Sequence, residues 1–380
     1  MNRRQLLKLA LIGSLPTALG GCTISEVRRS INASKNIIKG DYNQAIANQV
    51  PGMGVPEVDG FIRKGFKHFL DDISALWKDD KTPSPKVYVK YTDHFKSRAI
   101  IDFNLGSIEV ETLIDSEFKV ALKSAIVQTL LTPEDPSAID LYSAQAPIIG
   151  QTPFLIDLVR DHDNQQIRYQ WRAQRFADYL IKTHYQKVTL NKVTRHKVRF
   201  NMVADFKSQQ GKHYQYLVSK QASRFGLERA LVFSIIETES SFNPYAVSSA
   251  PAFGLMQIVP STAGRDVFRF LHKRDGMPTQ NQLFSAATNI EYGSAYLHIL
   301  FNRYLKDVRN PSSKEFCVIA AYNTGTGNVL KSFDSNRRVA VDKINRLSSE
   351  QVYQHLRKHL SSSEARNYLF KVTKNKQKYT

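Results

Sequence analysis

The hydrophobic pattern of the first half of the chain changes from helical to alternating spacing. Residues 61–77 predict an amphipathic helix, because their apolar side chains recur three and four positions apart. Three later segments alternate apolar and polar residues and predict consecutive strands: residues 87–91, 99–103 and 107–113. The turn residues at 104–106 are expected to join the last two strands as a hairpin.

The same half of the chain returns to helical spacing and then to alternation. A helix is predicted from about residue 117 to residue 131, before Pro133, and a second over residues 170–185. Residues 187–204 alternate again and predict a further strand. Residues 58–205 therefore predict an α+β unit, an N-terminal accessory domain in which we find no catalytic constellation.

From residue 206 onward the pattern is helical throughout. Residues 214–225 predict an amphipathic helix that ends at Gly226, a residue type suited to a left-handed C-terminal cap. Further helices are expected to begin near five residues: Leu227, Pro260, Ala286, Lys314 and Ser363. Residues 206–380 therefore predict a second, all-α domain.

The stretch 230–244 combines an apolar helix with one acidic side chain. Asn243 and Pro244 are expected to stop this helix, because proline has no amide donor. Glu239 shares a face with aliphatic residues three, four and seven positions before it. Desolvation and the negative end of the helix dipole then raise the pKa of the Glu239 carboxyl toward neutrality, which suits a general acid. Glu237 projects from another side. The alternative is that Glu239 only caps the helix or forms an ion pair.

Four sequence blocks, in one order over about 90 residues, separate these two interpretations: 239–248, 254–263, 289–297 and 320–325. Together they closely resemble the signature of the lytic transglycosylase (goose-lysozyme-like) family. The resemblance implies a lysozyme-like fold for residues 206–380, with Glu239 as catalytic acid and peptidoglycan glycan strands as substrate. The preceding α+β unit resembles that of the membrane-bound lytic murein transglycosylase C subgroup.

The resemblance also implies substrate-binding residues in the loop after the acid. Ser248 matches a serine that orients the substrate or the acid. Met256 and Gln257 match the wall of the glycan groove, where the thioether contacts a sugar ring and the amide bonds hydroxyls or an acetamido group. Judged alone, Met256 would be a core residue. Pro251 departs from the family pattern, which leaves the shape of this loop open.

Three further site residues come from the C-terminal blocks. Tyr322 matches the family tyrosine whose hydroxyl approaches the catalytic acid, and Asn323 accompanies it in the groove. Tyr368 resembles a tyrosine that lines the glycan cleft; judged from helix spacing alone it would be a core residue.

No second acid occurs in the matched blocks, which bears on the mechanism. A single acid suffices if the 6-hydroxyl of N-acetylmuramic acid attacks, giving a 1,6-anhydro end without metal or cofactor. One alternative is a hydrolytic muramidase in which Asp266 positions water. Another is a non-catalytic peptidoglycan-binding lipoprotein.

The N-terminus and the charge predict the compartment. Residues 1–21 have a basic start, an apolar segment and a lipobox-like end, so we expect a lipoprotein signal peptide and a lipid anchor on Cys22. Residues 22–57 would be the tether of a protein on the outer membrane, facing the periplasm. An ordinary signal peptide and a twin-arginine export route remain alternatives.

The formal charge of +19 falls to 19 − 3 = +16 without Arg3, Arg4 and Lys8 of the signal peptide. It indicates an anionic partner, but no nucleic-acid-binding motif is present and no protein partner is indicated. Two other features are expected to be structural. Cys317, among apolar neighbours, predicts a buried thiol without a disulfide. The acids at 161 and 163 around His162 predict a solvated or structural loop rather than a metal site.

Overall fold

The computed structural model describes residues 56–79, 81–136, 139–248 and 252–380, with side chains from residue 66 onward. The predicted signal peptide, Cys22 and nearly all of the predicted tether lie outside these residues. Two compact units are present, Met1–Lys67 and His68–Thr380, and helix α4 (Pro56–Trp77) runs from the first into the second. Within the described ranges, no helix combines the length and the apolar character needed to cross a bilayer.

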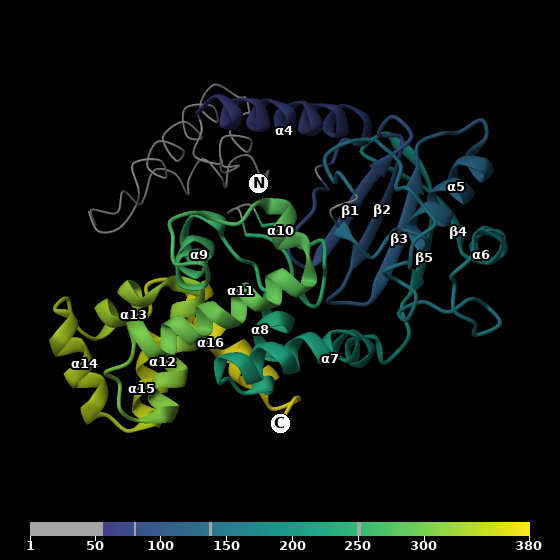
Figure 1. Cartoon of the computed structure of the whole chain (residues 1–380). Coiled ribbons are helices and arrows are strands. Elements are labelled where there is room, and N and C mark those ends of the chain that lie inside the picture. The colour runs from purple at the N-terminus through teal and green to yellow at the C-terminus, as the bar shows by residue number, and fades with distance from the viewer. Residues whose placement is uncertain (1–55, 80, 137–138, 249–251) are drawn as a thin grey trace. The chain divides into compact units, whose positions relative to one another are not determined.

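A five-stranded antiparallel sheet in the order β1-β2-β3-β5-β4 forms the first part of the second unit (Figure 1). Its elements are β1 (Val87–Thr92), β2 (Ser97–Asp102), β3 (Ser107–Thr112), β4 (Tyr185–Leu190) and β5 (Val193–Asn201), with helices α5 (Phe118–Leu130) and α6 (Gln170–Thr183) packed against it. The predicted three strands, the hairpin and both helices are confirmed.

The region predicted as one further strand, 187–204, is instead a hairpin of β4 and β5. Asn191 and Lys192 both have positive φ, 53° and 64°, as a two-residue hairpin turn of the primed type requires. Because the turn has only two residues, the apolar alternation of the two strands reads in the sequence as one continuous strand. The signal that was available is Asn191, which adopts the left-handed region more readily than most residues.

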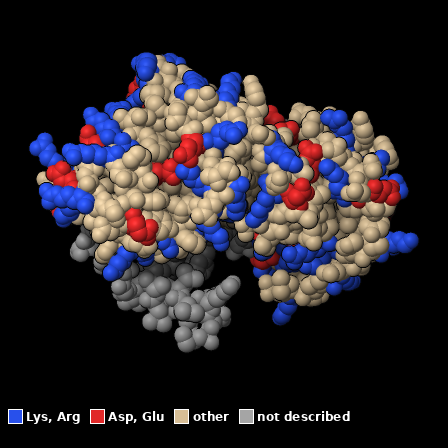
Figure 2. Space-filling view, turned by 90° about the horizontal axis from the view of Figure 1, so that it is seen from below, with Lys and Arg blue, Asp and Glu red and all other residues tan. Residues whose placement is uncertain are grey.

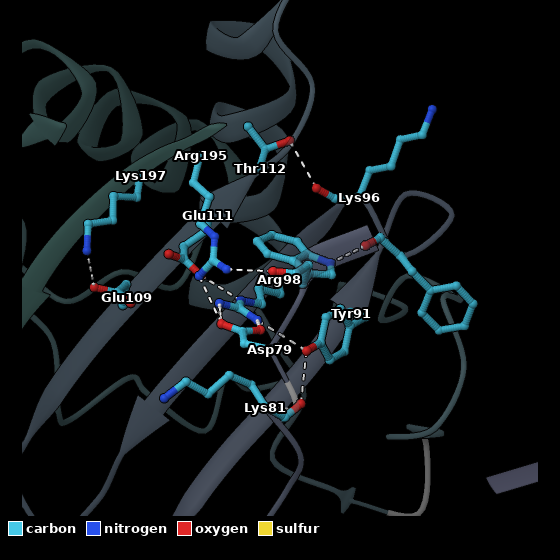
Figure 3. A network of polar contacts seen from close by, with 12 residues as sticks. Asp79, Lys81, Tyr91, Lys96, Arg98, Glu109, Glu111, Thr112, Arg195 and Lys197 are labelled. Atoms are coloured by element: carbon cyan, nitrogen blue, oxygen red, sulfur yellow. Dashed lines mark hydrogen bonds and ion pairs between the residues drawn. The ribbon is translucent and has the colours of Figure 1, made fainter. Parts of the chain in front are cut away.

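The two faces of the sheet differ in chemistry. Alternate residues such as Tyr88, Ile101 and Val198 point toward α5 and α6 and form an apolar core with them. The opposite face carries charges, and Arg98 bonds Glu111 Oε2 through Nε at 2.6 Å and Asp79 Oδ1 through Nη1 at 2.6 Å (Figure 3). Its guanidinium also lies 4.0 Å from the ring centre of Trp77, at the end of α4.

The remainder of the second unit is helical. Its elements are α7 (Phe206–Phe225), α8 (Arg229–Ser240), α9 (Arg265–His272), α10 (Gln280–Phe284), α11 (Ala286–Ile299), α12 (Pro311–Thr324), α13 (Thr326–Phe333), α14 (Arg337–Arg346), α15 (Ser349–His359) and α16 (Ser363–Lys376), with short π-helical segments at η2 (Pro260–Gly264) and η3 (Leu300–Tyr304). The cap at Gly226 is confirmed, with φ of +65°. The helix expected near Lys314 begins three residues earlier, because Asn310 caps it.

Three helices between residues 326 and 359, α13 to α15, were not predicted from the sequence. The strongest missed signal is at α15, where Ser348 and Gln351 form a capping box. These helices complete a second apolar core that is built from α7 to α16.

The loop after α8 connects the helical part to the sheet. Tyr245 is fully buried within the α5–α6 core, and its hydroxyl donates a hydrogen bond to the Pro133 carbonyl. Two residues earlier, Asn243 Nδ2 donates to the Pro85 carbonyl at 3.1 Å. Residues that follow the candidate acid in sequence are therefore fixed by the α+β part.

We expect Arg98→Met to destabilise the protein by about 3–5 kcal/mol, because it leaves Glu111 buried without its partner. Lys123→Met removes an exposed pair with Asp178 and is expected to cost at most about 1 kcal/mol. Urea unfolding followed by circular dichroism measures both changes. Equal losses in the two variants would contradict a structural role for the buried pair.

Candidate functional site

Helix α8 positions Glu239 in its last turn. The helix ends at Ser240, earlier than the predicted stop at Asn243 and Pro244. The reason is local: Ser241 and Phe242 adopt left-handed φ of 50° and 61°, which turns the chain away from the helix axis. Glu239 consequently lies beside the negative end of the helix dipole, which disfavours its ionised form.

The face of α8 that leads to Glu239 is apolar and buried, as predicted. Val232, Ile235 and Ile236 have no solvent-exposed surface, while Glu239 itself is only partly buried. Glu237, by contrast, has a structural role. It accepts hydrogen bonds from Lys378 Nζ at 2.7 Å and from the Tyr379 hydroxyl at 3.0 Å. The two acids of α8 thus have separate environments.

The direct partner of Glu239 is Tyr368 of α16, a helix that packs against α8. The Tyr368 hydroxyl donates to Glu239 Oε1 at 2.7 Å. Desolvation raises the pKa of Glu239 to about 7, against the opposing effect of this hydrogen bond. Near neutral pH the carboxyl is therefore protonated in a large fraction of molecules, and its carboxylate form keeps one hydrogen bond.

Two charged residues outside the predicted set also act on Glu239. After burial and Tyr368, the pKa of Glu239 is lowered by Lys86 and raised by Glu364. Lys86 precedes β1, and its neighbour Pro85 accepts the hydrogen bond from Asn243. The α+β part therefore contributes a cation to the surroundings of the acid, which no local motif in the sequence indicates.

Tyr322 was expected to bring its hydroxyl toward the acid. That hydroxyl donates its hydrogen bond to the Met256 carbonyl at 2.9 Å. The hydrogen bond to the acid itself comes from Tyr368. Tyr322 is still near enough to Glu239 for that carboxyl to help raise the Tyr322 pKa, after the larger effect of burial.

Met256 is corrected, from groove wall to core. Its side chain has no exposed surface and packs on Gly293, where an added Cβ would lie 2.2 Å from its Sδ. Asn289 holds the same turn, since its Oδ1 accepts from the Met256 amide at 2.7 Å. At Gly254, with φ of +72°, an added Cβ would lie 2.4 Å from Asn289 Nδ2. The 254–263 and 289–297 blocks thus fit each other, and Asn289 is a positioning residue that the sequence analysis missed.

Gln257 and Ser248 lie around this turn. Gln257 Nε2 donates to the carbonyls of Ala246 and Gly254, at 3.2 and 2.9 Å, while its buried Oε1 has no partner among the described residues. The donor side of the amide is therefore satisfied by the backbone, while its oxygen is not. Ser248 Oγ accepts from the Ala252 amide at 3.3 Å, and Pro251 lies outside the described residues.

Two candidates remain, Asn323 and Asp266. Asn323 Nδ2 donates to Glu364 Oε1 at 3.5 Å, which connects α12 to α16. Asp266, the alternative acid, accepts from the Tyr304 hydroxyl at 2.8 Å and is not among the charges that shift the Glu239 pKa. The structure therefore groups Glu239, Tyr322 and Tyr368, but not Asp266.

The 161–163 loop and Cys317, both expected to be structural, have structural environments. Asp161 accepts from Arg172 at 2.7 Å, and Asp163 pairs with Arg175 at 2.6 Å. Among the described residues there is no cluster of His, Cys, Asp and Glu suited to a metal ion. Cys317 is a fully buried free thiol, and burial raises its pKa to about 12. Lys and Arg side chains are spread over the face in Figure 2 rather than gathered into one patch.

Comparison with known families finds two matches along the chain. Residues 59–213 match the N-terminal domain family of membrane-bound lytic murein transglycosylase C, and residues 216–345 match the transglycosylase SLT domain. Two solved structures also match. Lytic transglycosylase Slt of Pseudomonas aeruginosa is 23% identical with a TM-score of 0.36, over 46% of this chain and 25% of that chain. The 70 kDa soluble lytic transglycosylase of Escherichia coli is 25% identical with a TM-score of 0.34, over 44% and 24%.

Two similar proteins that align with most of this chain share one name. Membrane-bound lytic murein transglycosylase C of Histophilus somni (strain 2336) is 42% identical over 347 residues, which cover 91% of this chain and 93% of that protein. Its namesake in Salmonella arizonae is 41% identical over 354 residues, covering 92% and 95%. With both domain families present and such relatives spanning nearly its whole length, the chain belongs to the membrane-bound lytic murein transglycosylase C family.

Proposed function

We propose that this enzyme, a lytic transglycosylase of peptidoglycan, uses Glu239 as its single acid and base. The bond cleaved is the β-1,4 linkage between N-acetylmuramic acid and N-acetylglucosamine. The observation that carries the proposal is the Glu239 carboxyl itself, which follows the buried aliphatic face of α8, accepts a hydrogen bond from Tyr368 and has its pKa raised to about 7 by desolvation. Such a group both donates and accepts a proton near neutral pH.

The reaction follows in two steps. Glu239 gives its proton to the glycosidic oxygen, and the bond from muramoyl C1 to that oxygen breaks, releasing the 4-hydroxyl of N-acetylglucosamine. The substrate's acetamido oxygen stabilises the positive charge at C1. The muramoyl 6-hydroxyl oxygen then attacks C1, and its proton returns to Glu239, which closes the 1,6-anhydro ring. The Tyr368 hydroxyl stabilises the carboxylate between the two steps.

The position of the other acids supports transglycosylation over hydrolysis. A hydrolase of the ordinary kind needs a second carboxylate near the first, about 5–10 Å away, to attack or to position water. Asp266 is bound to Tyr304 and is not among the charges that shift the Glu239 pKa, whereas Glu364, which raises that pKa, is exposed and accepts a hydrogen bond from Asn323. The intramolecular nucleophile needs no such partner.

The predicted substrate-binding residues and anchor belong to the same proposal. Gln257 would accept a hydrogen bond from the glycan, with Ser248 and Asn323 bordering the cleft. The acylated Cys22 would hold the enzyme on the outer membrane, facing the periplasm, in agreement with the words "membrane-bound" in the names of its relatives. Mass spectrometry of the membrane fraction tests acylation at Cys22.

Glu239→Gln is expected to lower glycan cleavage at least about a hundredfold, because the amide cannot donate the required proton. Folding should be preserved, since the amide oxygen still accepts from Tyr368. The matched control is Glu237→Gln on the same helix, which should retain activity. Release of soluble fragments from purified sacculi measures both, and full turnover by the Glu239 variant would refute the proposal.

The cleavage products are expected to carry 1,6-anhydro ends. A hydrolysed end is heavier than an anhydro end by the mass of one water molecule, so mass spectrometry of digested sacculi distinguishes them. Reducing ends as the main product would establish the enzyme as a muramidase instead. Absence of any cleavage would favour a binding protein.

Tyr368→Phe is expected to shift the high-pH limb of activity upward by about one pH unit. Activity requires protonated Glu239 and is lost as pH rises through its pKa. Removing a hydrogen bond that stabilises the carboxylate raises that pKa further. Tyr322→Phe is the control, because its hydroxyl bonds Met256 and not the acid. An unchanged limb in the Tyr368 variant would contradict the assigned contact.

A further inference from the structure

A cavity is lined in part by Phe242 and Pro244 of the loop that follows α8. It has a volume of about 290 Å³ and is bordered by α7 and by the segment of the α+β part between α5 and α6. Aromatic rings from both parts of the chain form its walls, namely Phe103, Phe154, Tyr214 and Phe242. Neither Glu239 nor Tyr368 lines it, so the cavity is separate from the acid.

Gln210, in the second turn of α7, gives this cavity an unusual polar group. Its side chain is only 4% exposed, and both its amide oxygen and its amide nitrogen are buried without a partner among the described residues. Leaving a buried polar group unpaired costs about 1–3 kcal/mol, and proteins seldom keep one without a reason. A side-chain amide presents a donor and an acceptor together, which complement the acceptor and donor of another amide.

The mouth of the cavity is charged. His213 and Glu134 pair at 2.7 Å, and Asp157 Oδ1 accepts from Gln166 Nε2 at 2.6 Å, so these groups are already partnered. Arg168 is exposed at the same mouth and forms no ion pair with another described residue. Its planar guanidinium is therefore available for an anion, and a carboxylate fits its two parallel donors.

We propose that this cavity binds a short peptide that ends in a free carboxylate. A peptide amide pairs with Gln210, the carboxylate pairs with Arg168, and small apolar side chains lie against the aromatic walls. The cavity is at the lower end of the size range of ligand pockets, about 300–1,000 Å³, which suits a few residues and not a glycan strand. The identification of that peptide as a peptidoglycan stem rests on the proposed function, and the bound stem would help hold the substrate while its glycan reaches Glu239.

The test is calorimetric titration of the full-length protein with three probes: N-acetyl-D-alanyl-D-alanine, the same peptide with a C-terminal amide, and N,N′-diacetylchitobiose. We expect the free-acid peptide to bind at least about tenfold more tightly than the amidated one. Gln210→Leu should weaken the free acid about tenfold or more. Arg168→Gln, an exposed change that leaves folding undisturbed, should remove the preference for the free acid.

The matched control is Gln221→Leu on the same helix. Gln221 is also buried with an unpartnered amide oxygen, but it does not line the cavity, so peptide binding should be unchanged. Equal affinity of the parent and the Gln210 variant for the free-acid peptide would overturn the proposal. So would binding of the chitobiose alone, which would make the cavity a sugar site, or binding of no probe, which would leave it a water-filled space.

Cleavage assays separate this proposal from the proposed function. With peptide-bearing sacculi, Gln210→Leu should raise the KM with little change in kcat. With glycan strands stripped of their peptides, its activity should equal that of the parent. Cleavage of both substrates with no effect of the variant would refute peptide binding alone, whereas no cleavage by the parent protein would refute the proposed function and leave the titration as an independent result.

Discussion

The hydrogen bond between Tyr368 and the desolvated Glu239 carboxyl is the interaction on which the site depends. Desolvation alone would raise the pKa of Glu239 further and make the carboxylate form less accessible. The tyrosine offsets part of that penalty and brings the two protonation states close in free energy near neutral pH. The bond also ties α16 to α8, so the C-terminal helix of the chain is part of the site.

A second constraint is the close packing of the turn at Met256. Gly254 and Gly293 allow two segments to approach so nearly that a methyl group at either would collide with Asn289 or Met256. Tyr322 adds a hydrogen bond to the same turn. Residues with the appearance of sugar ligands therefore serve largely to fix the backbone around the acid, and the amide oxygen of Gln257 is buried without a partner among the described residues.

The features predictable from the sequence were those with local causes. Strands β1 to β3, the cap at Gly226 and the apolar face of α8 that leads to Glu239 all follow from spacing and residue type. The errors concern long-range geometry. Which tyrosine reaches the acid depends on how α12 and α16 pack on α8, and Lys86 lies more than 150 positions from Glu239 in the sequence. Neither of these long-range contacts produces a hydrophobic periodicity that could be recognised in the sequence.

The burial of Tyr245 has a consequence for how such a protein can be divided or recombined. Its ring packs against Tyr88 and Phe154, at centroid distances of 5.0 and 5.3 Å, although it belongs to the helical part. A fragment cut at residue 205 would present this ring, with Val247 and Phe284, to water. If the α+β part or the helical part were exchanged for that of a relative, the new part would have to fit the same contact. Substitutions on the two sides of this contact are therefore expected to be inherited together.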